Sequence, residues 1–296
     1  MSAKAEKGYM AAVGTFDGVH RGHAFVIERL KAEAEAKSLK TKVITFDNHP
    51  MAVVAPQRCP SALSDSKERA LLLQSLGVDA VESIPFNSEL AALTAEQFLE
   101  FLHNEHNVKA LVMGFNNHIG SDRRTGESLG PECCGVEIIC LPELDSEDGV
   151  SSSAVRSALA NGDVSEAARL LGRPYSIMGN VVDGKHLGRK IGFPTANISP
   201  DDPRRMIPAE GVYAVDVILP SGQVHRGMVN IGHRPTVDCP DAPLSIEVNI
   251  FDFDGNLYGQ NIALRFLKHL RSEKRFPHID ALIAQLHIDR QAARNA

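Results

Sequence analysis

The pattern of hydrophobic and polar positions along the chain changes character near residue 172. Before that point, short apolar runs alternate with segments in which apolar residues recur at intervals of three and four. The apolar runs predict strands at residues 9–13, 41–46, 80–84, 111–113 and 137–141. The periodic segments predict helices at residues 24–37, 66–76, 95–105, 154–159 and 164–171. This alternation is typical of an α/β domain with a parallel sheet and helices on both faces.

Beyond residue 172 the pattern is β-rich and broken by Gly, Pro and Asp turns. It predicts strands at residues 179–182, 212–218, 225–231, 244–253 and 262–266. These strands favour a compact antiparallel barrel. Apolar residues at helical spacing over 279–286 predict one closing helix. Gly172 precedes Arg173 and Pro174, a combination that ends helices, so we place the domain boundary there and expect domains 1–172 and 173–296.

Length and charge narrow the class of protein. The 296 residues suffice for two domains of ordinary size, and a formal net charge of −6 argues against a protein that follows a nucleic-acid backbone. No apolar run is long enough to cross a membrane, and the opening residues lack the apolar core of a secretory signal. We therefore expect a cytoplasmic protein with no nucleic-acid or membrane partner. A homo-oligomer is compatible with these observations. The five cysteines contain no C-x-x-C pair, so reduced thiols are expected.

A glycine-rich segment with two histidines lies where the first predicted strand gives way to a helix. Residues 14–23 read GTFDGVHRGH, which contains H-x-G-H. A helix N-terminus offers unpaired N–H groups and the positive end of a dipole, glycines let an anion approach the backbone, and imidazoles can donate to phosphate oxygens. The segment therefore predicts a polyphosphate site. A pair of loop or capping histidines is the alternative.

Four segments, in order, resemble the nucleotidyltransferase domain of bacterial bifunctional riboflavin kinase/FAD synthetases. They are GTFDGVHRGH at 14–23, TFDNHP at 45–50, VMGFNNHIG at 112–120 and VSSSAVR at 150–156. The resemblance implies a Rossmann-like sheet of the HxGH type that adenylylates FMN with ATP and releases pyrophosphate. It implies that the ATP-binding residues are Gly14, Phe16, His20, Gly22, His23, Ser152, Ser153 and Arg156. By the same resemblance His20, His23 and Arg156 stabilise charge during catalysis.

One of these segments departs from the family pattern. Residues 116–119 read NNHI where the family often has Asp-Phe-x-Phe, so two aromatic positions are polar or aliphatic. Asn116, which the resemblance places near the flavin, can still donate and accept hydrogen bonds, but less stacking surface is available. Asn48 stands where the family has Pro, on the side of the site expected to bind adenine.

The second domain carries candidate metal ligands. Residues 179–186 lack the Ser or Thr that ends a P-loop, so that interpretation is rejected. Thr195 and Asn197 lie two residues apart on an extended segment, so both can offer oxygen ligands to magnesium from one side. A local turn after Pro194 is the alternative.

The segment GRKIGFPTAN at 188–197 resembles the riboflavin kinase signature G-R-x-x-G-F-P-T-A-N. The resemblance implies Mg²⁺ or Mn²⁺ at Thr195 and Asn197, and Glu247 as the base for the riboflavin 5′-hydroxyl. Alternation within the strand puts Glu247 on the other face of the strand from Ile246 and Val248, so its carboxylate can face a pocket. The alternative is that Glu247 is an ordinary exposed glutamate. The resemblance also implies that Gly184, Gly188 and Arg189 shape the loop that binds the ATP phosphates. It implies that Arg271 contacts flavin or phosphate.

Three functions remain open from the sequence. The first is a bifunctional enzyme whose substrates are ATP, riboflavin and FMN and whose final product is FAD. The second is a riboflavin kinase with an impaired adenylyltransferase domain. The third is a non-catalytic flavin- or nucleotide-binding regulatory protein. The products formed from riboflavin and Mg-ATP distinguish them: FAD, FMN alone, or neither.

Overall fold

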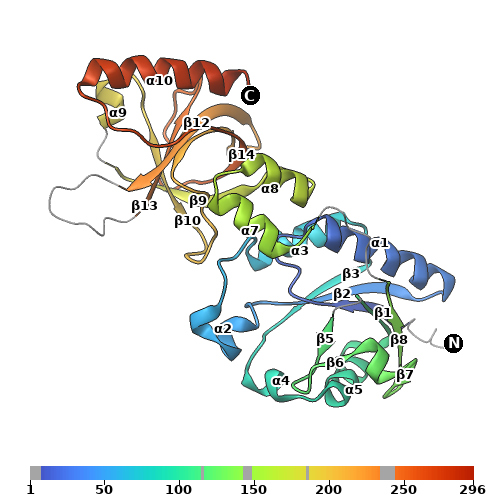
Figure 1. Cartoon of the computed structure of the whole chain (residues 1–296). Helices are drawn as coiled ribbons and strands as arrows, with labels where there is room; N and C mark the ends of the chain where they lie inside the picture. Colours follow the sequence, from blue (N-terminus) through green and yellow to red (C-terminus); the bar gives the residue numbers. More distant parts are fainter. Residues whose placement is uncertain (1–7, 115–116, 143–148, 185–186, 234–243) are drawn as a thin grey trace. The chain divides into compact units, whose positions relative to one another are not determined.

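The computed structural model describes residues 8–114, 117–142, 149–184, 187–233 and 244–296 (Figure 1). The chain divides into two compact units, Met1–Ser152 and Ser153–Ala296. The division falls at the start of helix α7 (Ser152–Ala160), so most of α7 and all of helix α8 (Val164–Leu171) belong to the second unit. A functional boundary after residue 172 stays a prediction.

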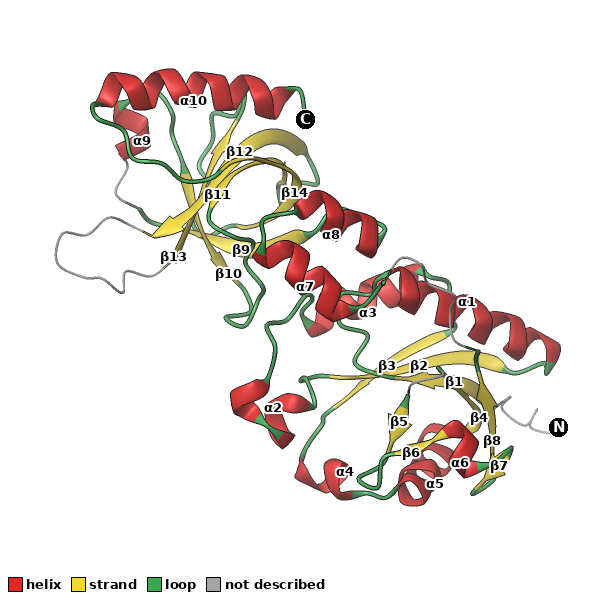
Figure 2. Ribbon diagram, in the orientation of Figure 1, coloured by secondary structure: helices red, strands yellow, loops and turns green. Residues whose placement is uncertain are grey.

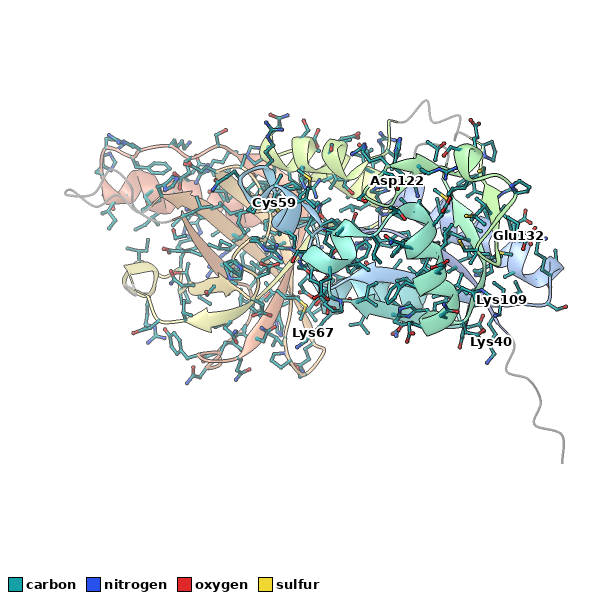
Figure 3. The ribbon with its side chains drawn as sticks, turned by 90° about the horizontal axis from the view of Figure 1, so that it is seen from below. Lys40, Cys59, Lys67, Lys109, Asp122 and Glu132 are labelled. Atoms are coloured by element: carbon teal, nitrogen blue, oxygen red, sulfur yellow. The ribbon has the colours of Figure 1, made fainter. Side chains whose placement is uncertain are left out.

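The first unit is built on a six-stranded sheet in the order β3-β2-β1-β4-β8-β7. Five strands are parallel, as expected: β1 (Tyr9–Val13), β2 (Lys40–Phe46), β3 (Ala80–Ile84), β4 (Val108–Met113) and β8 (Val136–Cys140). The edge strand β7 (Glu132–Cys133) is antiparallel to β8, which the sequence did not indicate. Lys40 and Lys109, labelled in Figure 3, lie at the edge where β2 and β4 begin.

Helices cover both faces of this sheet (Figure 2). On one face, helix α5 (Ala95–His106) packs its Leu99 and Leu102 against Ile44. On the other, Leu30 of helix α1 (Arg21–Ala36) packs against Val43, together with helix α3 (Ser66–Ser75). Adjacent strand residues thus point into different cores, as strand alternation requires. The remaining elements are α2 (Met51–Val54), η1 (Pro56–Arg58), α4 (Ser88–Ala92), β5 (His118–Ile119), β6 (Arg124–Thr125) and α6 (Gly126–Leu129).

The second unit is a closed antiparallel barrel in the order β10-β13-β12-β11-β14-β9, which confirms the expected architecture. Its strands are β9 (Ser176–Val182), β10 (Ala196–Pro200), β11 (Gly211–Ile218), β12 (Val224–His233), β13 (Leu244–Ile250) and β14 (Asn261–Arg271). The short helix α9 (Leu187–Lys190) precedes β10. The closing helix α10 (Ile279–Arg294) packs Ile283 and Leu286 against a cluster that includes Val212 and Met228 on the barrel. In the part of the chain that the structure describes, no helix is both long and apolar enough to span a bilayer.

Candidate active sites

The loop after β1 is held in an unusual backbone conformation. Phe16, Gly18 and Val19 have φ values of 46°, 77° and 41°. The left-handed region is costly for a β-branched residue such as Val19, so surrounding contacts must enforce it. The carboxylate of Asp17, which is only 4% exposed, accepts hydrogen bonds from the backbone N–H groups of Leu63 and Ser64. The loop is therefore fixed before any ligand arrives.

His20 and His23 form a reciprocal cap at the start of α1. The His23 N–H donates to His20 Nδ1 at 3.3 Å, and the His20 N–H donates to His23 Nδ1 at 3.3 Å. The two rings stack with centroids 3.6 Å apart. In a neutral imidazole whose Nδ1 accepts, the proton resides on Nε2. Each ring thus becomes an Nε2–H donor at a helix N-terminus, so capping and phosphate binding are compatible roles.

Two glycines and the side chain of Ser152 also shape the loop after β1. A Cβ on Gly22 would lie 3.2 Å from the His20 ring, so glycine lets that ring fold over the helix start. The Gly14 N–H donates to the Ile44 carbonyl at 3.1 Å. The Ser152 hydroxyl donates to the Asp17 carbonyl at 3.0 Å, which ties the start of α7 to the loop.

The other residues expected around this site lie on several elements of the chain. Ser153 and Arg156 lie on α7 in the second unit. Asn116 lies outside the described residues. The Asn48 side chain exchanges two hydrogen bonds with the backbone of Phe86, at 2.9 and 3.0 Å. That structural role for Asn48 was not foreseen.

In the barrel, Asn197 and Glu247 lie directly opposite each other on β10 and β13. Asn230 on β12 lies opposite Glu247 on its other side. Side chains paired across antiparallel strands project from the same face, so these three form a row on adjacent strands. Ile246 and Val248 are 4% and 0% exposed, which confirms that the neighbours of Glu247 point the opposite way, into the core.

A cavity of 860 Å³ lies beside β10 and β13, where Ala196, Val248 and Ile250 line it. It is lined by Thr195 and Arg189, two residues expected to bind metal and ATP, and thus brings them to one place. The loop after β13 supplies a further wall that includes Asp254, Asn256 and Tyr258. Sequence reasoning assigned these three no role, although the run DGNLYG marks a turn there.

Two glycines allow the segment before β10 to approach the candidate metal ligands. A Cβ on Gly184 would lie 2.1 Å from Asn197 Nδ2. A Cβ on Gly188 would lie 2.1 Å from the Phe193 carbonyl oxygen and 3.3 Å from Thr195 Oγ1. Gly188 is therefore required where the main chain meets the Phe193 carbonyl, and Gly184 and Gly188 themselves lie against Asn197 and Thr195. Their hydroxyl and amide oxygens are hard donors that suit magnesium.

Arg271 has a buried partner. Its Nε lies 3.0 Å, and its Nη2 2.8 Å, from Oδ2 of Asp289 on α10, whose side chain is only 3% exposed. Asp289 was not singled out from the sequence, because an acidic residue on an amphipathic helix usually faces water. The expected contact of Arg271 with flavin or phosphate stays a prediction.

Comparisons with known proteins match both halves of the chain. The FAD synthetase family model matches residues 2–155, and the riboflavin kinase model matches residues 171–296. A bifunctional riboflavin kinase/FMN adenylyltransferase of Escherichia coli K12 is 37% identical, over 99% of this chain and 94% of its own. The protein of that name from Bacillus subtilis is 38% identical, over 95% and 90%. A Streptococcus pneumoniae crystal structure, described as a macrolide-efflux protein, covers 99% of this chain and 96% of its own with TM-score 0.88 and 35% identity.

Proposed function

This chain belongs to the bifunctional riboflavin kinase/FMN adenylyltransferase family, and we propose how its residues divide the two reactions. The enzyme phosphorylates riboflavin to FMN and adenylylates FMN to FAD, with ATP as a substrate of both steps. The pairing of Asn197 with Glu247 on adjacent strands carries the assignment of the kinase site, and Thr195, two residues before Asn197, lines the cavity.

In the kinase reaction, Glu247 accepts the proton of the riboflavin 5′-hydroxyl as that oxygen attacks the γ-phosphorus of ATP, and ADP leaves. Thr195 and Asn197 hold Mg²⁺ or Mn²⁺ through their side-chain oxygens. When bound, the metal neutralises charge on the phosphate oxygens. Arg189 lines the cavity and binds phosphate, and Gly184 and Gly188 let the main chain approach Asn197 and Thr195. The support is the close approach of both glycines to the proposed ligands.

In the adenylyltransferase reaction, a phosphate oxygen of FMN attacks the α-phosphorus of ATP and pyrophosphate leaves. His20 and His23 donate from Nε2–H to the phosphate oxygens on which charge develops. Their reciprocal cap supports this role because it fixes both tautomers in advance. Ser152, Ser153 and Arg156 complete the phosphate clamp from the start of α7. Their part rests on the sequence resemblance, as does that of Asn116.

Several expectations are retained as proposals. The adenylyltransferase half occupies residues 1–172 and the kinase half 173–296. The protein acts in the cytoplasm and binds only small molecules. Both a monomer and a homo-oligomer are compatible with this proposal.

Product analysis with riboflavin and Mg-ATP tests the proposal. The natural chain is expected to form FMN and then FAD. Glu247→Gln keeps the side-chain shape and removes the base, and should lower the turnover of FMN formation by about a hundredfold or more. FMN supplied directly should still become FAD. Glu166→Gln on α8 is the matched control, since Glu166 is paired with Arg169 on the helix surface. Near-normal FMN formation by Glu247→Gln would return Glu247 to an ordinary strand residue.

A further inference from the structure

A second carboxylate, that of Glu273, lies on the same face of the barrel as Glu247. Asn230 Nδ2 donates to Glu273 Oε1 at 3.1 Å. Asn230 in turn lies directly opposite Glu247 in the register of β12 and β13. Since such paired residues have Cβ atoms about 5 Å apart, Glu273 contacts the immediate neighbour of the proposed base.

Gly232 provides the space for this carboxylate. A Cβ on Gly232 would lie 1.7 Å from Glu273 Oε1 and 2.2 Å from its Cδ. Gly232 is two residues beyond Asn230, so both are on the same face of β12. The Glu273 carboxylate therefore lies along β12 in a position that any side chain at residue 232 would occupy.

We propose that Glu273 binds the hydroxyl groups of the ribityl chain of riboflavin. The inference rests on the proposed function, because it takes Glu247 as the group that meets the 5′-hydroxyl. The ribityl chain carries hydroxyls on successive carbons, each able to donate one hydrogen bond, and an ionised carboxylate only accepts. With its 5′ end at Glu247, the chain has to cross about one strand spacing, roughly 4.8 Å, to reach β12. There Asn230 and Glu273 present an amide and a carboxylate to the remaining hydroxyls.

Two substitutions in the full-length chain test this proposal in different ways. Glu273→Gln removes the charge but keeps an oxygen for the Asn230 amide. Gly232→Ala keeps the carboxylate but displaces it, which the flexible Glu side chain permits. The assay is steady-state FMN formation, with the KM for riboflavin and the inhibition constant of lumiflavin, which has the ring system but a methyl group in place of ribityl.

Both variants are expected to raise the KM for riboflavin about tenfold, because hydrogen bonds to ionised acceptors are roughly twice as strong as neutral ones. The inhibition constant of lumiflavin and kcat should stay within about twofold, since the lost contact is made equally before and during the reaction. Glu166→Gln should change none of these constants.

An unchanged riboflavin KM in Glu273→Gln would overturn the proposal. So would an equal rise in the KM and the lumiflavin constant, which would mean that Glu273 only shapes the pocket. Should Gly232→Ala not fold, Glu273→Gln decides alone. Failure of the proposed function is distinguishable, because Glu247→Gln would then form FMN at a near-normal rate.

Discussion

At the scale of single residues, the sequence suggested chemical roles for side chains but not the contacts that hold them. The H-x-G-H pattern predicts that His20 and His23 donate to phosphate, and only the structure shows the mutual cap that fixes their tautomers. Asn48 was expected on the adenine side of the site, and the structure adds its hydrogen bonds to the backbone of Phe86, which the sequence did not suggest. Such contacts join residues distant in sequence, and neither periodicity nor spacing encodes them.

Thr41 and Asp79 form a polar bridge whose effect depends on pH. The Thr41 hydroxyl and N–H donate to Asp79 Oδ2 at 2.6 and 2.7 Å, and these bonds hold the pKa of Asp79 below its ordinary value of 3.8. A lowered folded-state pKa stabilises the fold above the ordinary pKa, and that stabilisation is lost as pH falls through the lowered value. Asp79 is exposed to solvent, which weakens these bonds, so Thr41→Val should lower the unfolding free energy at pH 7 by about 0.5 kcal/mol, the low end for one hydrogen bond.

Urea unfolding of the first unit at pH 7 and near pH 3 measures this difference. Thr41→Ser keeps the hydroxyl and should retain the pH dependence of the natural chain. A loss in Thr41→Val that is the same at both pH values would show that packing, not the hydrogen bonds to Asp79, is responsible.

At the scale of elements, long periodic segments were predicted and short ones were missed. Strand β3 and helix α8 have the expected bounds. The two-residue strands and four-residue helices carry too few positions for a period to show. β10 was missed because its Asn, Ser and Pro residues weaken a strand pattern, and β14 extends to Arg271 although Lys268 and His269 interrupt its apolar run.

The link between β14 and α10 depends on the Arg271–Asp289 pair. Asp289→Ala would leave a largely buried guanidinium without its carboxylate, and removing one partner of a buried pair costs about 3 kcal/mol. The unfolding free energy of the second unit should fall by about that amount. Glu166→Ala breaks the exposed pair with Arg169 and should have no measurable effect. Equal stabilities for the two variants would show that the pair does not hold α10 on the barrel.

At the scale of the whole molecule, the chain contains two units that each have their own core. α8 packs against β14, and Ala209 N–H donates to the carbonyl of Leu159 in α7 at 2.9 Å. A kinase fragment that begins at Arg173 lacks these contacts but keeps every proposed kinase residue. It should therefore make FMN, with a lower melting temperature than a fragment that begins at Ser153.

Thermal unfolding and FMN formation by the two fragments check this prediction. A folded Arg173 fragment that binds riboflavin and ATP but forms no FMN, while the full chain does, would place part of the kinase site before residue 173.

The two activities should also be separable by mutation, because the residues proposed for each phosphate clamp do not overlap. His23→Ala or Arg156→Ala should lower FAD formation by about a hundredfold to a thousandfold, the usual effect of losing one preorganised donor, and spare FMN formation. Thr195→Ala should stop FMN formation from riboflavin, while FMN supplied directly still becomes FAD. The rates of the two steps are measured separately by chromatography of the flavin products.

If Arg156→Ala abolished FMN formation in a folded protein, the two-site assignment would fail. The reason is that Arg156, although it lies in the same compact unit as the barrel, is assigned to the triphosphate of the adenylyltransferase.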